Sequence, residues 1–255
     1  METYKTALIT GASSGFGKAT AIKLAANGYN VIITGRRENY LRRLEEVIRS
    51  NSGVDVLTLH FDVRKSDEVE NSIDSLPEKM RNIDVLVNNA GLAVGLNPVQ
   101  GGLLDDWERM IDTNIKGLLY ITRKVVPLMV SRGSGHIINI GSVAGKEVYP
   151  EGNVYCATKS AVDALSKGMR LDLVKHGIKV TVIHPGMAET EFSLVRFKGD
   201  AVAASKVYYG LTPLNAEDVA DAVLFVVTRP AHVNINEMII MPAAQASATV
   251  VHRKE

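Results

Sequence analysis

The sequence predicts an α/β fold in which one doubly wound parallel sheet of about seven strands carries helices on both faces. Two observations support this fold class. Short apolar runs alternate with helical patterns along the whole chain, and the runs are apolar throughout, as expected of strands buried on both faces. No linker or change of composition divides the 255 residues, so we expect residues 1–255 to form a single domain.

Each element can be placed from its local pattern. The expected strands are Thr6–Thr10, Val31–Thr34, Val56–Phe61, Ile83–Val87, His136–Ile140, Lys179–Ile183 and Glu237–Met241. Helical spacing predicts helices after the turn Gly11–Gly17, at Arg42–Ser50, after a Ser66 cap, at Asp105–Met129, at Val154–Lys175 and at Asn215–Val227. Residues 190–210 form a mixed segment, and the C-terminal tail 242–255 has no clear periodicity.

The composition argues against several classes of function. A net charge of +1 gives no field that would attract nucleic acid or an anionic membrane. No signal peptide is visible, and the longest uncharged stretches contain Asn, Pro and Gly and are not expected to span a bilayer. The single cysteine, Cys156, excludes an intramolecular disulfide and fits a reducing compartment. We therefore expect a soluble cytoplasmic protein with no nucleic-acid or membrane partner, and we predict no metal.

A tyrosine and a lysine lie one helical turn apart. Tyr155 and Lys159 fall in the expected helix Val154–Lys175, where residues four apart share a face. A phenol titrates near 10, and a cation within about 4–6 Å lowers that pKa, so such a pair can exchange protons near neutrality. Ser142 follows the strand His136–Ile140, from which its hydroxyl could bond a substrate oxygen. On its own the pair is weak evidence, because most such pairs are exposed helix residues.

The glycine turn after the first strand favours a dinucleotide ligand. Its spacing from Gly11 to Gly17 is G-x-x-x-G-x-G, which lets backbone N–H groups and a helix N-terminus approach a pyrophosphate. Ser13 and Ser14 add hydroxyl donors. Ligands of open α/β sheets lie beyond the carboxyl ends of the strands. Further candidate residues follow expected strands at that edge: Arg36, Arg37, Asp62, Asn89–Gly91, Ser142 and Pro185–Gly186.

The end of the second strand predicts which dinucleotide binds. An acid there would bond the ribose 2′-hydroxyl and repel a 2′-phosphate. The chain instead has Arg36 and Arg37, with no acid before Glu38. Because guanidinium groups suit bidentate phosphate recognition, we predict NADP over NAD. The alternative is that both arginines are solvated residues at the start of a basic helix.

Several motifs together resemble the short-chain dehydrogenase/reductase family. The matching residues are Thr10-Gly11-x-x-x-Gly15-x-Gly17, Asn88–Gly91, Asn114, Ser142, Tyr155-x-x-x-Lys159 and Pro185-Gly186, in an order that covers essentially the whole chain. The resemblance implies a Rossmann-like dinucleotide-binding catalytic domain that transfers hydride to or from a carbonyl carbon. It implies Tyr155 as acid and base and Ser142 orienting the substrate oxygen. Lys159 would lower the tyrosine pKa and hold the nicotinamide ribose, and Asn114 would position a proton-relay water.

The resemblance also implies a set of cofactor-binding residues. These are Gly11, Ser13, Ser14, Gly15, Phe16, Gly17, Arg36, Arg37, Asp62, Val63, Asn89, Ala90, Gly91, Tyr155, Lys159, Pro185, Gly186 and Thr190.

The second half of the chain most closely resembles one branch of the family, the NADP-dependent serine and 3-hydroxy acid dehydrogenases. Segments 189–200, 212–214 and 217–220 and the ending 245–253 carry this likeness. It implies interconversion of the 3-hydroxyl of serine, allo-threonine or 3-hydroxypropionate-type acids with the carbonyl. Such acids need a cation, and Arg196, in the substrate-covering segment 190–210, and Lys146, after Ser142, are the candidates beside the substrate contacts Ser142 and Tyr155. Each cation has the alternative of an exposed surface charge.

Other functions stay open from the sequence. Within enzymes, the alternatives are reduction of sulfoacetaldehyde, of 3-oxoacyl thioesters or of general ketones and aldehydes. A non-catalytic NADP-binding protein is a further class, although Ser142, Tyr155 and Lys159 are all present. The long expected helices Asp105–Met129 and Val154–Lys175 carry small and apolar residues on more than one face. With the family resemblance, this favours a homotetramer.

Overall fold

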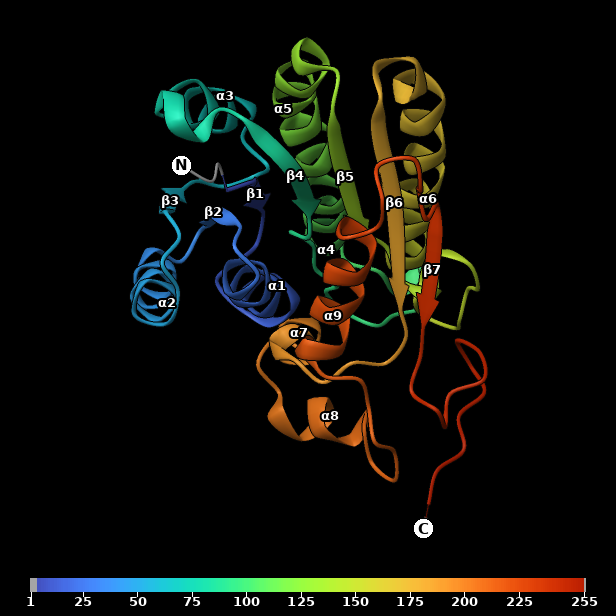
Figure 1. Ribbon diagram of the computed structural model, residues 1–255. Coiled ribbons are helices and arrows are strands. Elements are labelled where there is room, and N and C mark those ends of the chain that lie inside the picture. Colours follow the sequence, from blue (N-terminus) through green and yellow to red (C-terminus); the bar gives the residue numbers. More distant parts are fainter. Residues whose placement is uncertain (1–3, 255) are drawn as a thin grey trace.

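The computed structural model describes residues 4–254 and contains one parallel sheet of seven strands (Figure 1). Its strands are β1 (Thr6–Ile9), β2 (Asn30–Gly35), β3 (Val56–His60), β4 (Ile83–Asn88), β5 (Gly135–Ile140), β6 (Ile178–Pro185) and β7 (Glu237–Ile240). Their order is β3-β2-β1-β4-β5-β6-β7, and each neighbouring pair is parallel. The predicted fold class is confirmed. Because the order reverses between β1 and β4, a ligand crevice is expected at their carboxyl ends.

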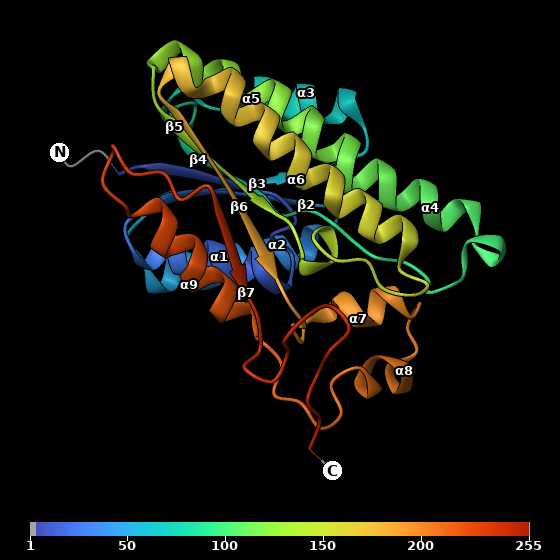
Figure 2. The same cartoon turned by 90° about the vertical axis from the view of Figure 1, so that its right-hand side faces the viewer.

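The helices lie in two layers, one on each face of the sheet (Figure 2). Helices α1, α2 and α9 cover one face, and α3, α5 and α6 cover the other. The described helices are α1 (Gly15–Ala26), α2 (Glu38–Asn51), α3 (Ser66–Asp74), α4 (Leu104–Ile111), α5 (Leu118–Arg132), α6 (Asn153–Leu173), α7 (Glu191–Arg196), α8 (Ala201–Lys206) and α9 (Ala216–Val227). No helix among residues 4–254 is long and apolar enough to cross a membrane.

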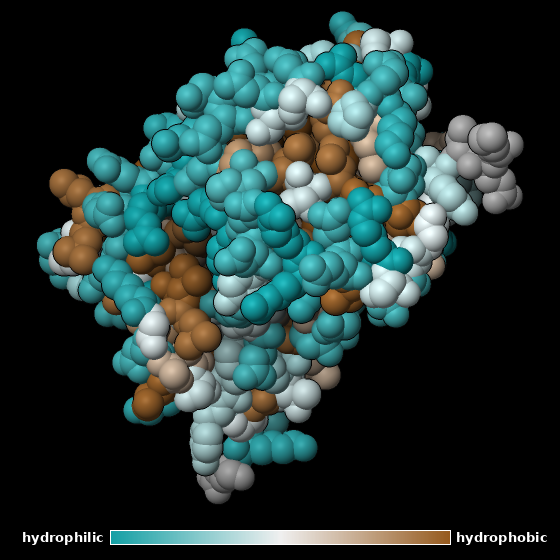
Figure 3. Space-filling view, turned by 90° about the vertical axis from the view of Figure 1, so that its left-hand side faces the viewer, coloured by the Kyte–Doolittle hydropathy of each residue, from teal (hydrophilic) through white to brown (hydrophobic). Residues whose placement is uncertain are grey.

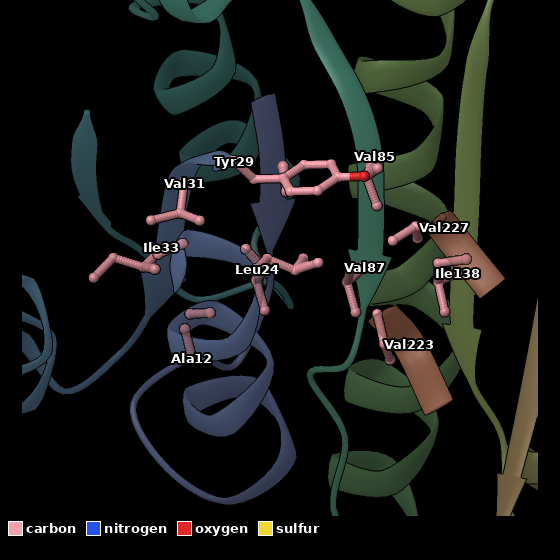
Figure 4. Packing of buried hydrophobic residues seen from close by; sticks show 14 of the residues in the cluster. Ala12, Leu24, Tyr29, Val31, Ile33, Val85, Val87, Ile138, Val223 and Val227 are labelled. Carbon is pink, nitrogen blue, oxygen red and sulfur yellow. The ribbon is translucent and has the colours of Figure 1, made fainter. Parts of the chain in front are cut away.

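Two hydrophobic cores lie between the sheet and its helices, one on each face. Successive residues of a strand point to opposite faces and so pack into different cores. On β1, Ile9 packs with the α1 and α9 side, whereas Leu8 packs with the α3 and α5 side. Figure 4 shows the first core, in which Val87 of β4 lies near Leu24 of α1 and Val223 of α9. Fully burying such a side chain contributes about 1.5–3 kcal/mol. The strands read as unbroken apolar runs because both faces are covered. The outer surface at the β3 edge is mainly hydrophilic, with small apolar recesses (Figure 3).

Two local predictions differ from the structure. The expected helix Asp105–Met129 is interrupted, because a π-helical segment (Asp112–Gly117) separates α4 from α5. In that segment Gly117 packs so closely on Val63 that a Cβ would lie 2.8 Å from its Cγ2 atom. Ser66 is not the cap of α3, because the N-cap is Lys65 and no side chain caps the helix. The nearby Glu68 carboxylate instead accepts a hydrogen bond from the Asp62 N–H.

A buried histidine on β5 makes stability depend on pH. His136 Nε2 lies 2.8 Å from Thr181 Oγ1, and the Thr181 hydroxyl donates to the Ile235 carbonyl, so the ring donates to threonine. Burial, assisted by the Lys179 charge, lowers the pKa of His136 from 6.5 to about 3. Between these two pH values the unfolded chain binds a proton that the folded chain does not, so stability falls as the pH drops below 6.5.

We therefore predict that His136→Gln, which keeps a donor near Thr181 but does not titrate, reduces the loss of stability at low pH. The wild type should lose about 2 kcal/mol more than the variant between pH 7.5 and pH 5. Urea unfolding at the two pH values measures the difference, and the shared loss from carboxylates cancels. Equal losses in both proteins would show that His136 is not the group responsible.

Candidate active site

Two connected hollows lie at the carboxyl edge of the sheet. The first, called here the cofactor cleft, has a volume of about 340 Å³ and runs past the ends of β1, β2 and β4. The second, the side cavity, has a volume of about 300 Å³ and lies beyond β5 and β6 under α7. Tyr155, Phe192 and Thr190 line both. This is the edge at which the fold class places ligands.

Most residues expected to hold a cofactor line the cofactor cleft. They are Gly11, Ser13, Ser14, Gly15, Phe16, Arg36, Arg37, Asp62, Val63, Asn89, Ala90, Gly91, Tyr155, Lys159 and Thr190. Pro185 and Gly186 line the side cavity instead. Gly17 lies beneath the cleft, packed against the Asn89 side chain and the Gly11 carbonyl, so a Cβ there would overlap both.

Asn89 joins the glycine turn to β4. Its Nδ2 donates to the Thr10 carbonyl at 2.8 Å and to the Gly11 carbonyl at 3.2 Å. Gly11 has a φ of +65°, which L side chains rarely adopt, and its missing Cβ would meet the Ala90 Cα at 2.9 Å. The turn is therefore held close to β4 with the start of α1 facing the cleft, which is the geometry that binds a pyrophosphate.

Two arginines stand at the end of β2. Arg37 Nε donates to Ser13 Oγ at 3.2 Å, and its Nη1 lies 2.8 Å from Glu191 Oε2 of α7. Arg36 Nη1 lies 3.8 Å from Asp62 Oδ2. Burial acts to raise the pKa of Asp62, but hydrogen bonds from Arg64 outweigh it and lower that pKa. The cleft end near β2 thus combines partly exposed guanidinium groups with a fixed carboxylate.

Helix α6 brings Tyr155 and Lys159 to the junction of the two hollows. Lys159 Nζ donates to the Ile140 carbonyl at 2.8 Å, and it lies 6.0 Å from the centre of the Tyr155 ring. Both side chains are buried. Burial lowers the pKa of Lys159 from 10.5 to about 8.

The acidity of Tyr155 differs from the prediction. Burial, together with Tyr149, raises the pKa of Tyr155 above its usual 10, against a hydrogen bond with Ser142 and the charge of Arg196. The expected lowering by Lys159 does not dominate in this structure, because removing the phenol from water favours its neutral form more strongly. Tyr155 is therefore a protonated phenol at neutral pH.

Ser142 and Asn114 are both held by backbone contacts. Ser142 Oγ accepts a hydrogen bond from the Ala144 N–H at 3.1 Å and lines the side cavity. Asn114, in the π-helical segment, accepts from the Leu92 N–H and donates to the Leu92 carbonyl, both at 2.9 Å. It also donates to Thr158 Oγ1 on α6 at 3.0 Å. The Asn114 side chain thus joins the loop after β4 to α6.

Arg196 reaches the side cavity, whereas Lys146 does not. Arg196 Nη2 donates to Tyr149 Oη at 2.8 Å, and its Cζ lies 5.6 Å from the centre of the Tyr155 ring. Within residues 4–254 its buried Nε has no hydrogen-bond partner. Lys146 Nζ is instead bonded to Asp163 at 2.9 Å and Glu237 at 2.7 Å. The structure therefore does not bring Lys146 to the expected substrate site: Asp163 and Glu237 bind its ammonium, and it lines neither hollow.

Some residues of the side cavity were not predicted from the sequence. Gln245, in the tail, is buried, and its Oε1 accepts a hydrogen bond from the Met187 N–H at 2.8 Å. Tyr208 donates to the Ala188 carbonyl at 2.7 Å. Both line the cavity, as does Tyr149. Tyr149 and Tyr208 lie in segments without clear periodicity. Gln245 begins the ending 245–253, which carries the likeness to one branch of the family but gives no residue a role, and only the folded chain brings the three together.

Comparison with known proteins decides the family. The family model described as short chain dehydrogenase matches residues 5–199. The chain belongs to the short-chain dehydrogenase family. The likeness predicted from the combined motifs is thereby confirmed, and Tyr155, Lys159 and Ser142 lie together in a member of that family.

Relatives of this short-chain dehydrogenase match nearly its whole length. NADP-dependent 3-hydroxy acid dehydrogenase YdfG of Salmonella typhimurium is 51% identical over 248 residues, 96% of this chain and 98% of that protein. Sulfoacetaldehyde reductase 2 of Chromohalobacter salexigens is 48% identical, with the same coverage. The closed form of serine dehydrogenase complexed with NADP+ has a TM-score of 0.92 at 47% identity and covers 98% of this chain and 100% of that one.

Burial of the Lys159 ammonium should cost this dehydrogenase stability. At pH 7 the folded lysine, with a pKa of about 8, is less easily charged than the unfolded one. Stability rises between pH 8 and 10.5, because there the folded lysine is neutral while the unfolded one still binds its proton. We predict that Lys159→Met raises the free energy of unfolding at pH 7 by about 1–3 kcal/mol, after allowing for the lost bond to Ile140.

Urea unfolding without cofactor measures this change, and the exposed Lys175→Met variant is the control, expected within about 0.5 kcal/mol of the wild type. A Lys159→Met protein no more stable than the wild type would contradict the cost assigned to burying this charge.

Proposed function

We propose that this short-chain dehydrogenase interconverts the 3-hydroxyl of small 3-hydroxy acids and the corresponding carbonyl with NADP. The observation that carries the proposal is the Arg196 guanidinium in the wall of the side cavity, 5.6 Å from the centre of the Tyr155 ring. A substrate anion bonded to Arg196 would hold the neighbouring hydroxyl or carbonyl at the phenol. Serine, allo-threonine and 3-hydroxypropionate fit this description.

The cofactor cleft fits NADP on its own geometry. Because Gly11 and Gly17 lack Cβ atoms, the glycine turn packs closely against β4, and this packing directs the start of α1 and its backbone donors toward the cleft, where they suit a pyrophosphate. At the ribose end, Arg36 and Arg37 line the cleft, whereas the first acid, Glu38, bonds Arg42 on the outside of α2 at 2.6 Å. NADP supplies the nicotinamide carbon that accepts or gives the hydride. The protein is therefore an NADP-dependent oxidoreductase, as its relatives' names indicate for them.

Tyr155 would transfer the proton. As a buried neutral phenol it is ready to protonate a carbonyl oxygen during reduction, and Ser142 would orient that oxygen. During oxidation the same oxygen must act as a base, which the nearby Lys159 ammonium and a positively charged nicotinamide favour. The proton would leave through Lys159 and a water positioned by Asn114. General acid or base catalysis of this kind contributes about 10²–10⁴-fold.

Arg196 can serve a carboxylate through unused donors. Its Nε has no partner among the described residues, and its Nη2 is held by Tyr149. Guanidinium groups bind carboxylates and sulfonates alike through such donors. Sulfoacetaldehyde carries its anion one methylene from the carbonyl carbon, as 3-oxo acids do. It is therefore a second candidate substrate, favoured by the likeness to sulfoacetaldehyde reductase 2.

Assembly as a homotetramer belongs to the same proposal. Large apolar side chains are exposed on the helices expected to pair, including Leu171 of α6 at 80% and Leu104 of α4 at 69%. Exposed apolar residues on long helices suit pairing between subunits. A cytoplasmic location stays a prediction from the composition.

The choice of NADP over NAD gives a direct prediction. Arg36→Ala/Arg37→Ala removes both guanidinium groups near the expected 2′-phosphate, so the Michaelis constant should rise at least about 10-fold for NADPH and change less than about threefold for NADH. Steady-state kinetics with each cofactor measures this. Similar increases for both cofactors would mean that the arginines do not read the phosphate.

The role of Arg196 is tested by substrate charge. Arg196→Ala should lower kcat/KM for 3-hydroxy acids and sulfoacetaldehyde by about 10²-fold or more, because a desolvated charge-assisted bond is lost, while a neutral aldehyde is affected less than about threefold. Lys198→Ala is the matched control, since this nearby cation is bonded to Asp106 at 2.8 Å and lines neither hollow. A uniform loss on all substrates would indicate a structural role for Arg196.

A further inference from the structure

A cluster of charged side chains lies behind Ser142, outside the two hollows. Lys146 follows the short 3-10 helix η4 (Val143–Gly145), Asp163 is on α6, His184 is on β6 and Glu237 is on β7. The Lys146 ammonium lies 2.9 Å from Asp163 Oδ1 and 2.7 Å from Glu237 Oε1. None of the four is among the residues that line the cofactor cleft or the side cavity.

His184 connects this cluster to the Ser142 backbone. Its Nδ1 lies 3.1 Å from the Ser142 carbonyl oxygen and 3.3 Å from the Ser142 nitrogen. With a proton on Nδ1 the ring donates to the carbonyl, and with that proton on Nε2 it accepts from the N–H, so either tautomer holds Ser142. The contact needs Gly141, because a Cβ there would lie 2.5 Å from Nδ1.

The other side of the imidazole faces the two carboxylates. Nε2 lies 3.5 Å from Asp163 Oδ1 and 3.7 Å from Glu237 Oε1, and it has no hydrogen-bond partner in the described part of the chain. An imidazole and two carboxylates at such distances could hold a metal ion. Here the Lys146 ammonium lies between the carboxylates, so the chain supplies the cation itself.

The cluster therefore binds both ends of the segment 142–146, called here the Ser142 loop. His184 holds its first residue through the backbone, and Asp163 and Glu237 hold Lys146 at its last. The middle of the loop rests on α6, where Ser160 Oγ donates to the Gly145 carbonyl at 3.0 Å. Asp163 lies one turn beyond Lys159 on the same helix, so the anchor and the Tyr155 phenol share one rigid element.

We propose that Lys146, Asp163, His184 and Glu237 act as positioning residues that hold the Ser142 hydroxyl in register with Tyr155. The proposal rests on the catalytic role proposed for Ser142 above. His184 and Asp163 are buried and Lys146 is partly buried, whereas Glu237 lies at the exposed side of the cluster. Removing Lys146 therefore leaves the buried Asp163 carboxylate with one cation fewer, which is costly away from water. A shift of about 1 Å in a positioned group can cost about 10²-fold in rate.

The first test compares two lysines that bond the same carboxylate. Lys146→Met removes the cation from the loop, whereas Lys167→Met removes the half-exposed partner that bonds Asp163 at 2.8 Å from α6 itself. We expect Lys146→Met to lower kcat by about 10- to 100-fold, with the dissociation constant for NADPH, measured by fluorescence titration, changed less than about twofold. Lys167→Met should keep kcat within about twofold of the wild type.

The second test uses rescue at His184. Asn places an amide near the Nδ1 position and can still bond the Ser142 backbone, whereas Gln places its amide near Nε2 and cannot. We expect His184→Asn to keep kcat within about threefold and His184→Gln to lose about 10-fold or more. Melting curves of both variants show whether they fold. If Lys146→Met does not fold, this pair decides the question, and equal kcat values for Asn and Gln would overturn the proposal.

The third test separates positioning from general damage to the structure. In a Ser142→Ala background, Lys146→Met should change kcat less than about twofold, because the hydroxyl that it positions is already absent. A full additional loss would overturn the proposal. The outcome is also distinct from failure of the proposed function. If Tyr155→Phe and Ser142→Ala each lower kcat by about 10²-fold or more while Lys146→Met and His184→Gln keep the wild-type kcat, the positioning role of the cluster is refuted and the function stands.

Discussion

A buried hydrogen bond from the Lys159 ammonium to the Ile140 carbonyl joins α6 to the end of β5. Tyr155 lies one turn before Lys159 on that helix, and Ser142 follows Ile140 by two residues, so this bond joins the two elements that carry the two hydroxyls. The buried ammonium has lost its hydration, which disfavours its charged form and so lowers the pKa of Lys159. Placing this cation beside the site thus lowers the stability of the folded chain, a cost that is common at functional sites.

The combined motifs were sufficient to predict the fold and the residues around Tyr155. Parallel strands buried on both faces leave continuous apolar runs, and residues after those strands must meet at one edge of the sheet. Gly11, Asn89 and Lys159 could therefore be placed together from the sequence alone, and they all line the cofactor cleft. The family and the NADP dependence of its relatives agree with this part of the prediction.

Properties that depend on distant partners could not be predicted in the same way. Lys146 follows Ser142 closely in sequence, but its ammonium is bound by Glu237, which lies on β7, distant in sequence. The pKa of Tyr155 depends on how completely the phenol is buried, which no spacing of residues reveals. The interruption of the expected helix by a π-helical segment, in which Asn114 bonds to Leu92 and Thr158, cannot be read from helical periodicity either.

The last residues of the described chain are part of the wall around the reacting groups. Gln245 accepts the Met187 N–H, and Arg253 donates to the carbonyls of Val207 and Tyr209, so the tail is fastened to the segment beside α8. An affinity tag or a fusion partner joined at the carboxyl end would pull on that wall. Expression vectors for this enzyme are therefore better built with the added sequence at the amino end, because Thr6 begins β1 at the edge of the parallel sheet opposite the two hollows.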